Sequence, residues 1–327
     1  MRSAGRLVAA ATKPRHVCAT TRDHILASDS WLLFVMHSTR DLRRRIKSIS
    51  STAQITKAMQ MVAASKMRKA QEAAIVGRPF VLLLYRIQRE ATTRMGDFTH
   101  PLLEVREVRK RAVILVGADK GLCGALNSNL FRLAAQFDPQ STVFITAGRK
   151  AAQFIARSRR QLVAEFAYGD EPKYPEARAI AAFARDLFLK KEVDQVQIVA
   201  TQFINTLTQH PVCVDFLPVG EVKGLKIPGM EPEEQLEAEV EAETTESLFE
   251  PSPEAVLGYF LPIYLNVYIY QTLLNAKASE QSARMVSMKN ATDNADHLIK
   301  DLTLEYNKLR QGNITKEILE IAGGQSD

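Results

Sequence analysis

The chain has 327 residues, 46% of them apolar and 24% charged, values typical of a globular protein. Its formal net charge is +6, yet residues 231–254 contain ten glutamates and no Lys or Arg, so the remainder is more basic than that charge suggests. A basic body predicts an acidic partner: nucleic acid, an anionic membrane or an acidic protein surface. Cys18, Cys123 and Cys213 lack metal-site spacing, and we expect reduced thiols, with Cys123 and Cys213 buried in apolar surroundings.

Residues 1–35 differ from the sequence that follows them. They are basic and rich in Ala, Ser and Thr, but their apolar run at 31–35 is too short for a secretory signal. Three interpretations compete: an organelle-targeting peptide, a disordered extension, or translated upstream sequence with the true start at Met36. We favour the last, because an orderly helical pattern begins directly after Met36.

A long helix is predicted from Ser38 to about Ile75, with Ser38 or Thr39 as its cap. Apolar or small residues recur at steps of four and three, which indicates a coiled-coil partner. They are Leu42, Ile46, Ile49, Ala53, Ala63, Met67, Ala70 and Ala74. A second set is expected to widen this stripe: Ile55, Met59 and Val62.

The outer face of this helix is strongly basic. It carries Arg40, Arg43, Arg44, Arg45, Lys47, Lys57, Lys66, Arg68 and Lys69. One interpretation is a solvated face on a structural coiled coil, and the other is a basic rod lying inside an acidic sleeve. The residue pattern alone leaves both open.

The middle of the chain alternates strands and helices. Strands are predicted at 111–118, 142–147, 196–201 and 212–219. Helices are predicted after Gly124, from Gly148 to about Arg157, and at 175–191. This alternation is typical of an open α/β sheet with crossover helices.

A second long helical pattern runs from 253 to 321, interrupted only weakly, by Gly258, Pro262 and Gly312. Its uncharged stretch at 256–274 approaches the length of a membrane span. However, Pro262, Asn266 and Gln271 favour a helix that is buried inside the protein.

The fold class that follows is α/β: a long antiparallel coiled coil of N- and C-terminal helices with an inserted Rossmann-like open α/β domain. We expect five parts along the chain. These are a leader, extension or misassigned start at 1–35, an N-terminal shaft helix at 36–95, an α/β foot domain at 105–220, an acidic mobile loop at 221–251 and a C-terminal shaft helix at 252–327.

The loop GADKGLCGALN at 117–127 lies where a nucleotide-binding loop would lie, between a buried strand and a helix. Its glycines, Gly121 and Gly124, have the wrong spacing for a P-loop, and no Lys-Ser/Thr follows them. It also lacks the dinucleotide pattern G-x-G-x-x-G. The histidines are scattered and no acid/base pair is evident, so we expect no catalytic, metal-binding or cofactor-binding residue.

Four segments resemble the gamma subunit of F-type ATP synthases. They are STRDLRRRIKSISSTAQITKAMQMVAASKMRKAQ at 38–71, DKGLCGALNSN at 119–129, SEQSARMVSMKNATDNA at 279–295 and LTLEYNKLRQGNITKEILEI at 302–321. The resemblance covers nearly everything from Met36 onward, in the right order. It implies a non-catalytic central rotor shaft of a proton-translocating ATP synthase, which couples proton-driven rotation to ATP synthesis at the beta subunits and influences ATPase activity and proton flow.

The resemblance also implies the partners. They are three alpha and three beta subunits, the epsilon and delta subunits, and the membrane rotor c-ring, with no cofactor, no nucleic acid and only indirect membrane association. The implied location is the cytoplasmic side of a bacterial inner membrane, as a peripheral subunit, or alternatively the matrix side of a mitochondrial inner membrane.

Eight positions match motif residues that contact beta subunits in that family. Lys57, Met59 and Met61 would approach an acidic lever segment of beta. Arg310 and Gln311 would form a polar catch with beta, and the tip residues Ile314, Ile318 and Ile321 would lie in an apolar bearing. Gly312 and Asn313 depart from the family pattern and put the stiffness of this tip in doubt.

Two functions of other classes remain open on the residues alone. The first is a nucleic-acid-binding coiled coil that uses the basic face between Arg40 and Lys69. The second is an enzyme that uses the loop at Gly121.

Overall fold

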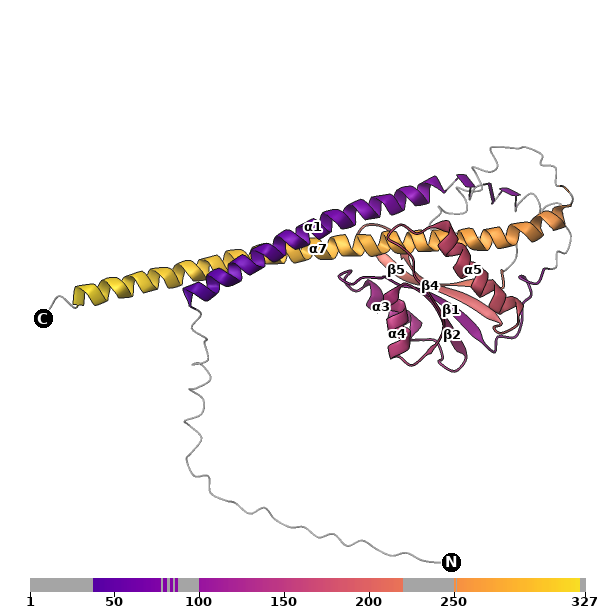
Figure 1. The fold of residues 1–327 in the computed structure, drawn as a ribbon, viewed down its shortest axis with the longest axis horizontal. Coiled ribbons are helices and arrows are strands. Elements are labelled where there is room, and N and C mark those ends of the chain that lie inside the picture. The colour runs from indigo at the N-terminus through magenta and orange to yellow at the C-terminus, as the bar shows by residue number, and fades with distance from the viewer. Residues whose placement is uncertain are drawn as a thin grey trace, which may run out of the picture. The chain divides into compact units, whose positions relative to one another are not determined.

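The computed structural model describes residues 38–77, 79–80, 83–84, 86–87, 100–219, 250 and 252–323. The expected leader at 1–35 lies outside the described residues, as does the acidic loop at 221–251 apart from Glu250. The elements of Figure 1 are α1 (Thr39–Val76), β1 (Arg111–Val116), α3 (Leu126–Ala134), β2 (Thr142–Ala147), α4 (Arg149–Arg157), β3 (Gln161–Phe166), α5 (Tyr174–Leu189), β4 (Gln195–Phe203), β5 (Gln209–Leu217) and α7 (Pro253–Gly323).

The helix α1 begins and ends close to its predicted limits. Its start is capped by Ser38, whose Oγ accepts a hydrogen bond from the backbone N–H of Asp41 at 3.3 Å. The Asp41 carboxylate lies in the first turn, near the positive end of the helix dipole. At the other end the helix stops before Gly77, the first Gly or Pro after Ser38.

Two compact parts are described separately: the described residues within 46–301, and residues 38–45 with 302–323. Within the first, α1 and α7 run antiparallel. The hydroxyls of Thr56 and Thr292 lie 2.7 Å apart, and further along α1 a Cβ at Gly77 would lie 2.9 Å from Gln271, which is earlier in α7. Within the second, Arg43 Nη2 donates to the Tyr306 hydroxyl at 2.7 Å.

Small side chains form the buried face of α1, as predicted, with Ala53, Ala63 and Ala70 all buried. The prediction that Ile55 and Val62 widen this face is wrong, because their side chains are 60% and 54% exposed. Ile55 follows Ala53 by two positions, which places it on the opposite side of a helix with 3.6 residues per turn.

The sheet has the strand order β3-β2-β1-β4-β5. The first four strands are parallel, and β5 pairs antiparallel with β4. Sequence reasoning did not predict β3, whose side chains alternate between exposed and half-buried along a sheet edge. The predicted strand at 142–147 coincides with β2, all of which is buried.

Helices cover both faces of this sheet (Figure 1). Ala112, Ile114 and Val116 of β1 pack in one core with residues of α5 and α7. Val113 and Leu115, which point the opposite way, pack in a second core with residues of α3 and α4. The alternating side chains of β1 therefore join two cores, and α7 belongs to one of them.

The uncharged part of α7 is buried on several sides, as predicted, although Tyr259 and Ile263 are exposed. Leu257, Leu261, Leu265, Ile269 and Leu273 are each at most 1% exposed. The helix continues past Pro262 and Gly312, so the departure at Gly312 does not interrupt it. Among the described residues, no helix is both long enough and apolar enough to span a bilayer.

Candidate functional site

The glycine loop lies at the topological switch point of the sheet. β1 pairs with β2 on one side and with β4 on the other, and open α/β sheets commonly bind ligands at the carboxyl ends of two such strands. The loop that leaves β1 contains Lys120 and Gly121 and leads into α3. This is therefore the place where a nucleotide site would be expected.

A side chain of α7 occupies this position. Arg284 Nη2 donates to the backbone carbonyls of Lys120 and Gly121 at 3.3 and 3.2 Å, and its Nε also donates to Gly121 at 3.3 Å. On the next strand, Ser279 Oγ donates to the carbonyl of Thr201 at 3.4 Å. The helix thus ties together the ends of β1 and β4, and the loop binds the chain's own arginine.

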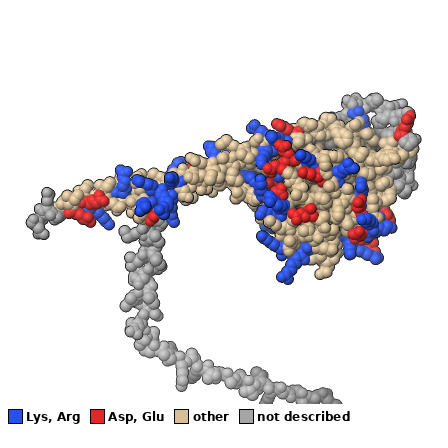
Figure 2. All heavy atoms as spheres, in the orientation of Figure 1, with Lys and Arg blue, Asp and Glu red and all other residues tan. Residues whose placement is uncertain are grey.

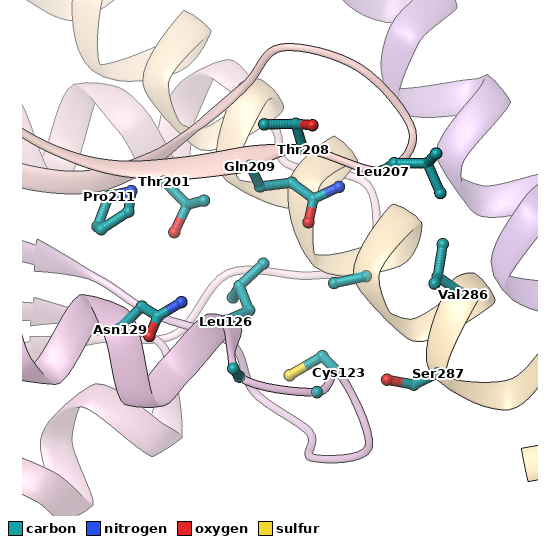
Figure 3. A pocket seen from close by; sticks show the side chains of 13 residues that line it. Cys123, Leu126, Asn129, Thr201, Leu207, Thr208, Gln209, Pro211, Val286 and Ser287 are labelled. Carbon is teal, nitrogen blue, oxygen red and sulfur yellow. The ribbon is translucent and has the colours of Figure 1, made fainter. Parts of the chain in front are cut away.

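A pocket of about 300 Å³ remains beside this contact (Figure 3). Cys123, Leu126, Thr201, Gln209 and Ser287 are among the residues around it, and every residue that lines it is uncharged. The lining has no carboxylate, histidine, Lys or Arg, so it offers no cation for a phosphate, and burial raises the pKa of the Cys123 thiol in it. Within the described parts of the chain, no cluster of His, Cys, Asp and Glu is placed to hold a metal ion.

The two described cysteines differ in their surroundings. Cys123 is buried, and this burial raises the pKa of its thiol. The prediction that Cys213 is buried is wrong, because Cys213 lies exposed on β5. It stands on an outer strand of the sheet, where an apolar sequence context does not ensure that both faces are covered.

Sequence reasoning missed a group of charged side chains on α7. Lys277 is 0% exposed and Glu280 2%, and Lys277 Nζ donates to Glu280 Oε2 at 3.1 Å. The second carboxylate oxygen of Glu280, Oε1, accepts a hydrogen bond from Arg284 Nη2 at 2.7 Å. The group could have been predicted from its spacing: Lys277, Glu280 and Arg284 are three and four residues apart, which places them on one face of α7 directly after its uncharged stretch.

The predicted lever contacts on α1 do not share one face. Lys57 and Met61 are both exposed and lie one turn apart, whereas Met59 is half-buried and points elsewhere. Met59 instead shares its face with the exposed Ile55 and Val62, which are four residues before it and three after it. The geometry therefore offers two separate strips on α1.

The predicted contacts near the end of α7 form a single exposed stripe. Arg310 and Gln311 are exposed, and the isoleucines at 314, 318 and 321 are 43%, 59% and 73% exposed. Their spacing of four and three residues places these isoleucines on one side of the helix. An apolar stripe of this kind, on a helix that continues to Gly323, is typical of a surface that binds a partner.

The basic face of α1 serves the chain's own contacts in part. Figure 2 shows Lys and Arg gathered over the N-terminal end of α1 on the visible face. Among the cations along the whole of α1, Arg43 binds Tyr306, while Lys66 and Lys69, nearer its C-terminal end, pair with Asp170 and Glu171. Part of the basic face therefore pairs with groups of the same chain, and only the remainder can be solvated or bind a partner.

Comparison with known proteins identifies the family. The family model described as ATP synthase matches residues 38–326. The ATP synthase gamma chain of Opitutus terrae is 46% identical over 291 residues, which cover 89% of this chain and 98% of the relative. That of Methylacidiphilum infernorum is 44% identical over 295 residues, covering 89% and 99%.

Solved structures share the fold. A chain in the Euglena gracilis mitochondrial ATP synthase, in a structure described as OSCP/F1/c-ring, matches with a TM-score of 0.59 at 18% identity, covering 88% of this chain and 93% of that one. A chain in the Euglena gracilis rotor matches with a TM-score of 0.57 at 17% identity, covering 84% and 98%. From the family model and the curated relatives, the chain belongs to the ATP synthase gamma-chain family.

Proposed function

We propose that this chain is the central rotor shaft of a proton-translocating F-type ATP synthase. The observation that carries the proposal is α7, a single helix of 71 residues. Its first part is buried against the α/β sheet, and its last part presents the exposed stripe at 314, 318 and 321. A continuous helix with one part embedded and another available to partners is suited to transmit torque between two sets of subunits.

The partners of this shaft would be a ring of three alpha and three beta subunits, together with the epsilon and delta subunits and the membrane c-ring. The stripe on α7 fits an apolar bearing in the ring, and Arg310 and Gln311 can form hydrogen bonds beside it. The exposed cation of Lys57 suits the acidic lever of beta. Proton-driven rotation would then bias each beta subunit in turn toward different states, because the contacts differ with the angle of the shaft.

The chain itself would be non-catalytic. The switch point of its sheet is occupied by Arg284, and the neighbouring pocket has an uncharged lining. ATP synthesis and hydrolysis would take place in the ring, and the shaft would influence ATPase activity and proton flow mechanically. The five-part division of the chain, with an α/β foot at 105–220, remains part of this proposal.

The bacterial origin of the curated relatives supports a bacterial location. We propose a peripheral subunit on the cytoplasmic side of the inner membrane, attached through the c-ring. The alternative is the matrix side of a mitochondrial inner membrane.

Affinity purification of the tagged chain from its native membranes tests the function. We expect alpha, beta and epsilon subunits in the eluate, together with ATPase activity. A chain that purifies alone, or with nucleic acid, would contradict the proposal.

The lever contact has its own test in Met59→Lys. A new ion pair with the beta lever would be worth ~1–3 kcal/mol if partly desolvated, so coupling of hydrolysis to proton transport should become poorer while assembly is retained. Met61→Lys, on the strip of α1 that also carries Lys57, shows by comparison which of the two strips meets the lever. If the coupling of ATP hydrolysis to proton transport is unchanged in vesicles that carry Met59→Lys, Met59 does not contact the lever.

A further inference from the structure

One carboxylate contacts both long helices. Asp170 lies in the connection between β3 and α5. Lys66 of α1 donates to its Oδ2 at 2.5 Å, and Nζ of Lys277 on α7 lies 3.4 Å from its Oδ1. The Lys120 ammonium, in the glycine loop, is 4.0 Å from Oδ2. We call Asp170 with Lys66 and Lys277 the Asp170 junction.

The α7 side of this junction is fixed in place. Lys277 is fully buried, pairs with the buried Glu280, and lies 5.2 Å from the centre of the Tyr168 ring. Tyr168 in turn donates its hydroxyl hydrogen to the carbonyl of Gly117, at the end of β1, at 3.0 Å. A cation held by two carboxylates and an aromatic ring has little freedom to leave its position.

The α1 side depends more on this junction, because α1 is packed less deeply. α7 contributes many large side chains to the core of the sheet, whereas the buried residues of α1 between 46 and 76 are three alanines. Side-chain contacts that join α1 to the connection after β3 are Lys66–Asp170 and Lys69–Glu171. Alanine packing alone resists sliding and rotation of a helix weakly, since it supplies few interlocking side chains.

The two pairs differ in exposure. The side chains of Lys66 and Asp170 are 34% and 38% exposed, against 62% and 70% for Lys69 and Glu171. Exposed ion pairs contribute little because water and salt screen them. The cations around Asp170, with the Lys66 hydrogen bond as the largest influence, lower the pKa of its carboxyl to about 2, so the group is ionised at neutral pH.

We propose that Asp170 is a positioning residue that holds α1 and α7 at one rotational setting against the α/β sheet, so that torque reaches both helices of the shaft together. This inference rests on the proposed rotor-shaft function. It assigns a mechanical role to a side chain that is not among the predicted contacts with the ring.

The test compares Asp170→Asn with Asp170→Glu and Glu171→Gln in the assembled complex. Asp170→Asn removes the charge but leaves Lys277 paired with Glu280, so the chain still folds. Asp170→Glu keeps the charge, and Glu171→Gln removes a charge from the neighbouring residue. The two readouts are hydrogen exchange of α1 amides around Lys66 and, in vesicles, the ratio of proton pumping to ATP hydrolysis.

We expect Asp170→Asn to increase exchange around Lys66 about tenfold, as for the loss of one charge-assisted hydrogen bond. The pumping ratio should fall while ATP hydrolysis persists, and both readouts should stay near wild type in Asp170→Glu and Glu171→Gln. Wild-type values for Asp170→Asn, or an equal loss in Glu171→Gln, would overturn the inference. If the wild-type complex does not pump at all, the rotor-shaft proposal fails, and the exchange result still decides whether the junction holds α1.

Discussion

Arg284→Met offers a direct test of how α7 closes the switch point of the sheet. Methionine retains much of the aliphatic volume of arginine and removes the guanidinium. The change deletes the hydrogen bonds to the carbonyls of Lys120 and Gly121 and those to the side chains of Glu280 and Gln281. Both loop residues are exposed, so water can satisfy their carbonyls, and Glu280 keeps Lys277 at 3.1 Å.

The expected cost is therefore that of a charged hydrogen bond and not of an orphaned buried charge. We expect Arg284→Met to lower the free energy of unfolding by ~1.5–3 kcal/mol. Glu280→Ala should cost more, ~3–5 kcal/mol, because it leaves the fully buried Lys277 beside Arg284 with only the half-exposed Asp170 as a counter-charge.

Urea titrations of the full-length wild type and both variants, with unfolding monitored by circular dichroism, measure these differences. Hydrogen exchange of the loop at 119–124 should rise in Arg284→Met, because that loop loses its attachment to α7. An Arg284→Met variant within ~0.5 kcal/mol of wild type, or one less stable than Glu280→Ala, would refute this reasoning.

Three further changes follow from packing and charge. Ala63→Leu should cost ~1–3 kcal/mol by overpacking the buried face of α1, whereas Ile55→Ser, at an exposed site, should stay within ~0.5 kcal/mol in the same titration. Gly148→Ala should be strongly destabilising, since φ is +98° and the new Cβ would lie 2.1 Å from the carbonyl oxygen of Gly117; a wild-type melting temperature would contradict this. The folded-state pKa of Asp170 is about 2, below its ordinary value of 3.8, so its stabilisation is present above pH 4 and lost as the pH falls toward 2. Asp170→Asn should remove that part of the pH dependence. If stability between pH 2 and 4 falls as steeply in this variant as in the wild type, Asp170 is not its source.

The long helices could be predicted because their signals are local. The alanine spacing of α1 and the absence of Gly or Pro before Gly77 determine its length. The uncharged stretch of α7 was correctly predicted to be buried, since its interior Pro, Asn and Gln do not suit a lipid environment. β2 was found because all of its side chains are buried, which produces a continuous apolar run.

The rest depended on tertiary contacts that the sequence does not display. β3 escaped prediction because an edge strand needs no continuous apolar run, and QLVAEF mixes polar and apolar residues. Ile55 is a different case, because its spacing of two positions from Ala53 already places it opposite the buried face of α1. The Asp170 junction joins residues far apart along the chain, and a pattern read along one helix cannot show such a meeting.

Direct observation of rotation tests the central proposal most directly. Cys213 is exposed on β5 and Cys123 is buried, so a bead can be attached through Cys213 once Cys18 is replaced by serine. With the ring of alpha and beta subunits immobilised and ATP supplied, we predict continuous rotation of the bead in one direction. A bead that stays stationary while the same complexes hydrolyse ATP would contradict the account of this chain as a rotor shaft.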